Sequence, residues 1–163
     1  MPGMILIVLS VVLAAVLGET KPDKERAPDT VVFVCQHGNV KSLIAREWFN
    51  RLAGERGLAA RAVSRGLTPA PSIPSAIGDA LRRDGFDVSG FKARAFTAAD
   101  LAVAARIVAI GVDPSSLETR GDVRVETWDG VPPATERYAA SRDALRARIE
   151  GLLATLGTEG RNR

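Results

Sequence analysis

Side chains suited to demanding chemistry are scarce in this chain of 163 residues, which has one cysteine and one histidine. A single cysteine excludes an intramolecular disulfide and a zinc site built from several thiolates, and a single histidine leaves little for a His-based metal site or a Ser-His-Asp triad. Aromatic residues are only 5%, and the net charge of +3 is far below that of a dense basic surface for nucleic acid. We therefore expect no metal, no cofactor and no nucleic-acid partner, whereas the mild positive charge suits an anionic substrate.

Charge is also missing from the first 18 residues, "MPGMILIVLSVVLAAVLG". This run has the length of a signal-peptide core and is borderline for a membrane span, which needs about 20 apolar residues. Lys21, Lys24 and Arg26 follow the run instead of preceding it, which favours a cytoplasmic position for that flank. We expect residues 1–18 to be a leader for export or a membrane anchor, with the side of the membrane open and a buried helix of the fold as the alternative. Residues 19–30 are expected to be a linker.

Hydrophobic periodicity in the remainder predicts strands that alternate with helices. The strands are expected at 31–34, 59–64, 106–112 and 123–127, and the helices at 42–52, 73–84, 98–103 and 138–156. Such alternation indicates a three-layer α/β fold, with a central four-stranded parallel sheet and helices on both faces. We expect one domain over residues 31–158 and a short tail over 159–163.

The stretch "VVFVCQHGNVKSLIAREWF" places Cys35 at the carboxyl end of the first strand, where ligands bind in such sheets. Ser42 is a good N-cap for the helix that follows. Backbone N–H groups between a strand and a helix attract a tetrahedral oxyanion such as phosphate or arsenate. Gly38 and Asn39 readily adopt the unusual φ angles of such a loop.

Two interpretations of Cys35 remain open at this point. It is either a buried structural cysteine or a nucleophile whose pKa is lowered by the helix N-terminus and a nearby cation. Lys41 would supply that cation and grip the oxyanion, and Ser42 can donate a hydrogen bond to the thiolate.

The segment "VCQHGNVKSLIA" resembles the phosphate loop of the low-molecular-weight protein tyrosine phosphatases and the related thioredoxin-coupled arsenate reductases. Their pattern is Cys, five residues, Arg, then Ser or Thr. The likeness continues through "GFDVSG", a "T-x-x-D" segment and "AIGVD", and covers about residues 31–156. It implies the fold of that superfamily, with Cys35 as a nucleophile that forms a phosphocysteine.

The resemblance also implies roles for the other site residues. Asp129, in "TWDGVPPAT", corresponds to the general acid, and Trp128 is a candidate pocket wall, whereas Asp113 in "GVDPSS" matches a loop-bracing position. Ser42 would support the thiolate, and Asn39 would hold the loop shape. The backbone that cradles the oxyanion would be that of Gln36, His37, Gly38, Asn39, Val40 and Lys41.

Three departures leave the function open. Lys41 replaces the family arginine, and a lysine is a point charge without the planar fork that binds two oxygens. Asp129 is not followed by proline, and no second cysteine exists to resolve an arsenylated Cys35. The leading hypothesis is a phosphomonoester hydrolase for phosphotyrosine in proteins or for a small aryl phosphate. The alternatives are an arsenate reductase that uses an external thiol and a weakly active domain that binds phosphate or another tetrahedral oxyanion.

Overall fold

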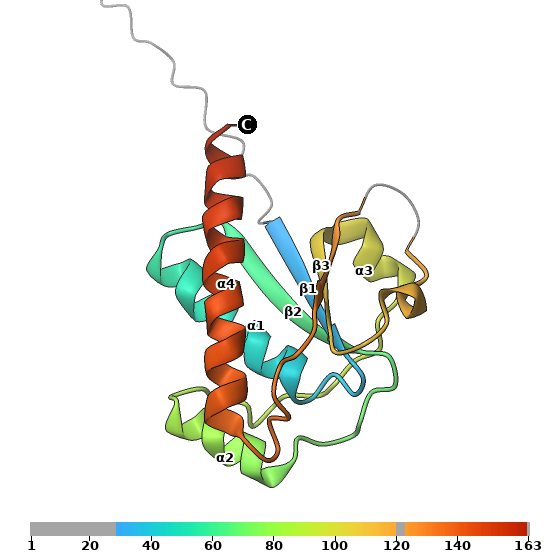
Figure 1. Ribbon diagram of the computed structural model, residues 1–163, viewed down its shortest axis with the longest axis vertical. Coiled ribbons are helices and arrows are strands. Elements are labelled where there is room, and N and C mark those ends of the chain that lie inside the picture. The colour runs from blue at the N-terminus through green and yellow to red at the C-terminus, as the bar shows by residue number, and fades with distance from the viewer. Residues whose placement is uncertain (1–28, 120–122, 163) are drawn as a thin grey trace, which may run out of the picture.

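The computed structural model describes residues 29–119 and 123–162, which form an α/β fold around a four-stranded parallel sheet (Figure 1). The strand order is β2-β1-β3-β4. The strands are β1 (Asp29–Cys35), β2 (Ala60–Gly66), β3 (Ala104–Ile110) and β4 (Val125–Trp128). The helices are α1 (Lys41–Glu55), α2 (Ser75–Arg83), α3 (Ala98–Val103), the 3-10 helix η1 (Pro114–Leu117) and α4 (Tyr138–Arg161). The predicted fold class is confirmed.

The alternation of side chains along β1 builds the two outer layers. Val31, Phe33 and Cys35 face the larger core, which α1 and α4 cover, whereas Val32 and Val34 face the smaller core beneath α3 and η1. Because both faces are covered, β1 is apolar at every central position, as expected of a buried parallel strand. Figure 1 shows α4 and α3 on opposite sides of the sheet.

Strand β1 and helix α4 both extend beyond the bounds that the sequence predicted. Asp29 and Thr30 were assigned to the linker, but they pair with β2 as the first residues of β1. Residues 159–163 were assigned to a tail, but α4 continues to Arg161 because Glu159 binds β3, as described below. The expected leader, residues 1–18, lies outside the described residues, and within the described ranges no helix is long and apolar enough to cross a membrane.

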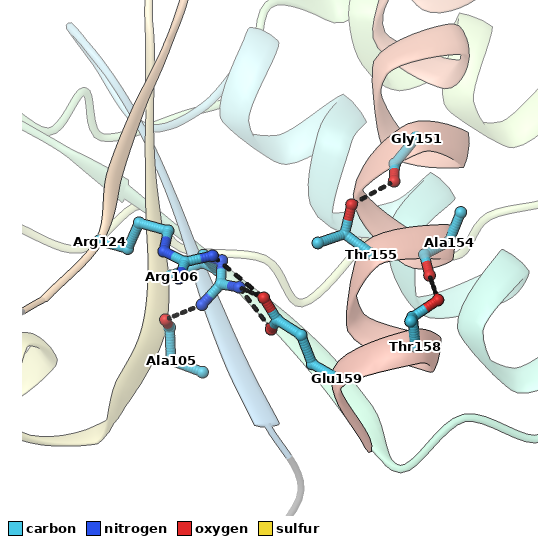
Figure 2. Close-up of polar contacts among 8 residues, drawn as sticks. All are labelled: Ala105, Arg106, Arg124, Gly151, Ala154, Thr155, Thr158 and Glu159. Carbon is cyan, nitrogen blue, oxygen red and sulfur yellow. Dashed lines mark hydrogen bonds and ion pairs between the residues drawn. The ribbon is translucent and has the colours of Figure 1, made fainter. Parts of the chain in front are cut away.

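The amino end of the sheet is closed by an ion-pair cluster (Figure 2). Arg106, on β3, is only 7% exposed, and its Nη2 donates to both carboxylate oxygens of Glu159 at 2.6 and 2.5 Å. Arg124 donates from Nη1 to the same carboxylate at 3.0 Å. A buried guanidinium needs such a partner, since an unpaired buried charge is strongly destabilising. The cluster therefore fixes the last turn of α4 to the sheet.

Candidate active site

The site begins with the orientation of Cys35 at the carboxyl end of β1. Strand alternation directs its side chain to the α1 side of the sheet, where it is 6% exposed. Its Sγ lies 3.1 Å from the hydroxyl of Ser42, in the first turn of α1. β1 also lies where the chain switches direction across the sheet, between β2 and β3, which is the usual ligand site of such folds.

The prediction that Ser42 caps α1 was wrong. The helix begins one residue earlier, at Lys41, and the N-cap position is Val40, whose side chain cannot accept a hydrogen bond. Ser42 is fully buried and its hydroxyl is used by Cys35 instead. The first N–H groups of α1 therefore have no side-chain acceptor at the N-cap. Together with the helix dipole, they favour an anion at this point.

The loop from Gln36 to Val40 is shaped by a contact between two glycines. Gly38 has a φ of 69°, and a Cβ on it would lie 2.7 Å from the backbone nitrogen of Gly66 at the end of β2. A Cβ on Gly66 would lie equally close to the nitrogen of Gly38. Both positions therefore require glycine, one for its conformation and both for the close approach of the two backbones.

A second loop, residues 67–72, holds the first loop from outside. The N–H groups of Leu67, Thr68 and Ala70 donate to the carbonyls of residues 35, 36 and 37 at 3.1, 2.8 and 3.1 Å. These bonds use carbonyls of the first loop as acceptors, so they leave its N–H groups for other partners.

The side chains of the same loop take part in this bracing. Asn39 donates from Nδ2 to the carbonyl of Ser72 at 2.6 Å, and Gln36 donates from Nε2 to the Thr68 hydroxyl at 2.7 Å. His37 is exposed, and its Nδ1 lies 3.1 Å from the Thr68 carbonyl. The only histidine of the chain is thus engaged in holding the loop.

Lys41 makes a contact that the sequence did not predict. Its Nζ donates to the carbonyl of Val131 at 3.0 Å, in the segment that joins β4 to α4. An ammonium has three donors, so one is used for this bond and the others can face the pocket that Lys41 also lines. Within the part of the chain that the structure describes, no carboxylate forms an ion pair with Lys41. Its charge therefore remains available to an anion.

A pocket of about 230 Å³ opens above Cys35. It is lined by residues 35–41, by the end of β3 and by the segment after β4. The lining residues are Cys35, Gln36, His37, Asn39, Val40, Lys41, Ile110, Gly111, Pro133, Ala134 and Thr135. The structure thus gathers most of the predicted loop residues around one cavity.

Asp129 and Trp128 do not line this pocket. Asp129 is exposed, and its carbonyl accepts a hydrogen bond from Arg148 Nη2 at 2.5 Å, which ties the segment to α4. Trp128 is 7% exposed and packs in the core, with its ring 5.5 Å from that of Phe33. Trp128 packs on the core side of β4, and its role as a pocket wall stays a prediction.

The other aspartate that the sequence singled out, Asp113, has a local structural role. Its carboxylate accepts from the backbone N–H of Ser115 at 2.9 Å and caps η1. Hydrogen bonds from Ser115 hold the pKa of this carboxyl below its ordinary value. The expectation that Asp113 braces a loop agrees with this geometry.

The family model for low molecular weight phosphotyrosine protein phosphatase matches residues 30–162 of the chain. The chain belongs to this family. A search of curated protein sequences found no significant match.

Solved structures of other proteins share the fold of this family member. YfkJ from Bacillus subtilis superposes with a TM-score of 0.70 at 23% identity, over 83% of this chain and 98% of that chain. A thioredoxin-dependent arsenate reductase from Corynebacterium glutamicum superposes with a TM-score of 0.69 at 18% identity, over 83% of this chain and 65% of that chain. A low molecular weight protein tyrosine phosphatase from T. tengcongensis superposes with a TM-score of 0.59 at 22% identity, over 78% of this chain and 99% of that chain. At these identities the likeness shows the fold alone.

Some site residues of this family member were missed by the sequence analysis. Pro133, Ala134 and Thr135 form a pocket wall, and Val131 supplies the acceptor for Lys41. The proline pair in "DGVPPAT" indicated only a loop, because no local pattern tells which loop residues turn toward a distant strand end. The roles of Cys35 and Asp129 in chemistry stay predictions.

Proposed function

We propose that the chain is a Cys-dependent phosphomonoester hydrolase that works through a phosphocysteine intermediate. The observation that supports this most is the position of Cys35, with its Sγ 3.1 Å from the Ser42 hydroxyl at the floor of a pocket at the N-terminus of α1. The Ser42 hydroxyl is placed to donate a hydrogen bond to the sulfur, and the helix dipole favours negative charge at this point. An anion that enters the pocket meets the same field.

The proposed reaction has two steps. The Cys35 thiolate attacks phosphorus, the ester P–O bond breaks, and Asp129 gives its proton to the leaving oxygen. Water then attacks the phosphocysteine, Asp129 takes a proton from that water, and the P–S bond breaks to release phosphate and the thiolate. Because Asp129 lies outside the pocket lining, the segment that carries it must approach when substrate binds.

The proposed substrate class is phosphotyrosine or a small aryl phosphate. Ile110, Pro133 and Ala134, together with Val40 from the loop itself, give the pocket an apolar lining. Such a lining suits an aromatic ring that enters behind its phosphate group, because a ring buries a large apolar area.

With Lys41 in place of the family arginine, we expect a lower catalytic efficiency. The Lys41 ammonium donates one hydrogen bond to the Val131 carbonyl. Unlike a planar guanidinium, it cannot bind two oxygens of the transition state side by side. We assign it two tasks, which are to attract the oxyanion and to hold the segment after β4.

Arsenate reduction is the second candidate. The fold is shared with a thioredoxin-dependent arsenate reductase, but Cys35 is the single cysteine of this chain. Arsenate bound to Cys35 would have to be reduced by a thiol from outside, which oxidises two thiols to a disulfide for each arsenite released. Water alone completes the hydrolase cycle.

The test is turnover of p-nitrophenyl phosphate by the full chain, with Cys35→Ser as the matched control. We expect turnover by the native chain and its loss in the variant, with unchanged circular dichroism. Iodoacetate at pH 6 should alkylate Cys35, and phosphate should protect it. Vanadate binding without any turnover would overturn the hydrolase and support the binding domain, whereas arsenite production with glutathione, but no phosphate release, would support the reductase.

We propose in addition that residues 1–18 direct the chain to a membrane or across it. The support is their lack of charge over a run of apolar residues. A reporter protein fused after Thr30 should be found in the membrane fraction or outside the cell. Recovery of the intact fusion in the soluble cytoplasmic fraction would overturn this proposal.

A further inference from the structure

A second polar groove lies at the free edge of β2, away from the pocket above Cys35. It has a volume of about 290 Å³ and lies between α1, β2 and residues 91–94. It is lined by Arg46, Glu47, Asn50, Ala62, Val63, Ser64, Arg65, Phe91, Lys92 and Arg94. Four cationic side chains and one carboxylate therefore surround it.

The backbone edge of β2 is already covered on both sides of Ser64. Asn50 accepts from the N–H of Ala62 at 2.7 Å and donates to its carbonyl at 3.2 Å, as a neighbouring strand would. At Gly66, the N–H donates to the Arg94 carbonyl at 2.9 Å, and the carbonyl accepts from the Phe96 N–H at 3.0 Å. An added peptide strand therefore has little edge to pair with, and a small ligand fits the groove better.

Two of the cations are fixed in place before any ligand arrives. Arg65 donates from Nε to Asp100 at 2.8 Å and from Nη1 to the Ser64 carbonyl at 2.9 Å. Arg46 pairs with Glu47, and its guanidinium lies 4.7 Å from the centre of the Phe91 ring. Guanidinium groups held in this way lose little conformational entropy when they bind a further oxygen.

Charge and an unused hydroxyl both point to a ligand. Lys92 and Arg94 are exposed, and no described carboxylate forms an ion pair with either of them. Ser64 is 3% exposed, and its hydroxyl has no hydrogen-bond partner. Its side chain faces α1, as the neighbouring alternate residue Ala62 does, and so points to the groove side of the sheet. A buried hydroxyl without a partner is unfavourable, and an acceptor in the groove would satisfy it.

We propose that this groove is a second anion site, which takes a small dianion of the charge and size of phosphate. Arg46 and Arg65 form its ordered wall, Lys92 and Arg94 close over the ligand from the solvent side, and the Ser64 hydroxyl donates to one oxygen. The site is distinct from the phosphate loop, because none of its residues lines the pocket above Cys35.

Inorganic phosphate titrated into the full chain and followed by two-dimensional ¹⁵N NMR tests the proposal. Arginine Nε–H resonances of Arg46 and Arg65 and the amide of Ser64 report the groove, whereas the amides of residues 36–41 report the phosphate loop. We expect two saturable sets of shifts with different midpoints. Shifts confined to the phosphate loop, or groove shifts that chloride reproduces at equal ionic strength, would overturn the proposal.

A pair of charge-matched variants identifies the residues. Lys92→Ala/Arg94→Ala should weaken phosphate binding in the groove by about tenfold, since each exposed charge contributes modestly, and should leave the titration of residues 36–41 unchanged. Arg82→Ala/Arg83→Ala, on α2, removes the same charge elsewhere and should change neither midpoint. Equal weakening by both double variants would show general charge attraction and overturn the site. The resonances of the groove and those of residues 36–41 are separate. A negative result for the groove therefore does not contradict the proposed hydrolase, and loss of the hydrolase proposal does not contradict the groove site.

Discussion

The two ends of the sheet handle positive charge in opposite ways. At the amino end, the buried Arg106 is neutralised by Glu159, which Arg124 shares. At the carboxyl end, Lys41 donates to a neutral carbonyl, and the loop beside it is held by backbone hydrogen bonds. The first arrangement uses up the charge to fix a helix, and the second keeps the charge for a ligand. The ion pair that fixes α4 and the proposed anion site therefore lie at opposite ends of the sheet.

The strongest test of the carboxyl end concerns the general acid. Asp129→Ala should lower kcat for phenyl phosphate by about 10²–10³, and by less for p-nitrophenyl phosphate, whose leaving group needs no proton. Asp113→Ala is the matched control and should leave kcat unchanged, because Asp113 caps η1. If Asp129→Ala has no effect on either substrate, the acid is another group.

Lys41 variants test whether its charge is kept for the ligand. Lys41→Met should lower kcat/KM and vanadate affinity by about 10–100-fold, since one cation at the oxyanion is lost. Lys41→Arg should tighten vanadate binding by restoring the fork. Unchanged affinity and turnover in Lys41→Met would show that the ammonium does not face the oxyanion, and weaker binding in Lys41→Arg would show a loop adjusted to lysine.

The glycine contact tests whether the loop is held by the fold. Gly66→Ala should lower the free energy of unfolding by about 2 kcal/mol, because its Cβ meets the Gly38 nitrogen at 2.7 Å, and should also weaken phosphate binding. Gly54→Ala, on α1, meets nothing within 4 Å and should stabilise by about 0.5–1 kcal/mol. Urea denaturation measures both, and equal effects would show that the two backbones separate easily.

The smallest effect on turnover is expected from variants at the amino end of the sheet. Arg106→Met removes the buried charge with little change in volume and should cost less than about 1.5 kcal/mol. Glu159→Gln should be more destabilising, since it leaves the Arg106 charge buried without its partner. Both variants should leave turnover unchanged. A lower kcat in either variant would show that the ion pair at the amino end also affects the site at the carboxyl end.

The pH dependence of unfolding also tests the ion pair at the amino end of the sheet. Partial burial raises the pKa of Glu159, but hydrogen bonds and charges from Arg106 and Arg124 outweigh it and lower the pKa below the ordinary value of 4.5. A lowered carboxyl pKa stabilises the fold above that ordinary value, and the contribution is lost as pH falls through the folded-state pKa. The urea midpoint of the native chain should therefore fall below pH 4.5 more steeply than that of Glu159→Gln.

The sequence predicted the sheet because each strand carries its own local signal. The run "VVFV" and the spacing of Leu43, Trp48 and Phe49 do not depend on the rest of the chain. The start of α1 was misplaced because Ser42 had two available partners, the helix backbone and Cys35 seven residues earlier, and only the fold decides between them.

The other features that the sequence did not predict depend on contacts between distant segments of the chain. The bracing of the phosphate loop by residues 67–72 joins positions about thirty residues apart. The last two turns of α4 contain Gly157 and Gly160, which weaken a helix, yet Glu159 anchors them to Arg106 on β3. Propensity alone places the helix end too early, because the anchoring residue is 53 positions away.

The solitary Cys35 also determines how the protein responds to oxidants. Peroxide oxidises a nucleophilic cysteine, as Cys35 is proposed to be, to a sulfenic acid. Many such residues are then protected by a disulfide to a neighbouring cysteine, but this chain has no second one. Recovery of Cys35 requires a thiol from another molecule, and without one the next oxidation, to the sulfinic acid, is irreversible. The redox state of the surrounding compartment therefore sets how long the site survives.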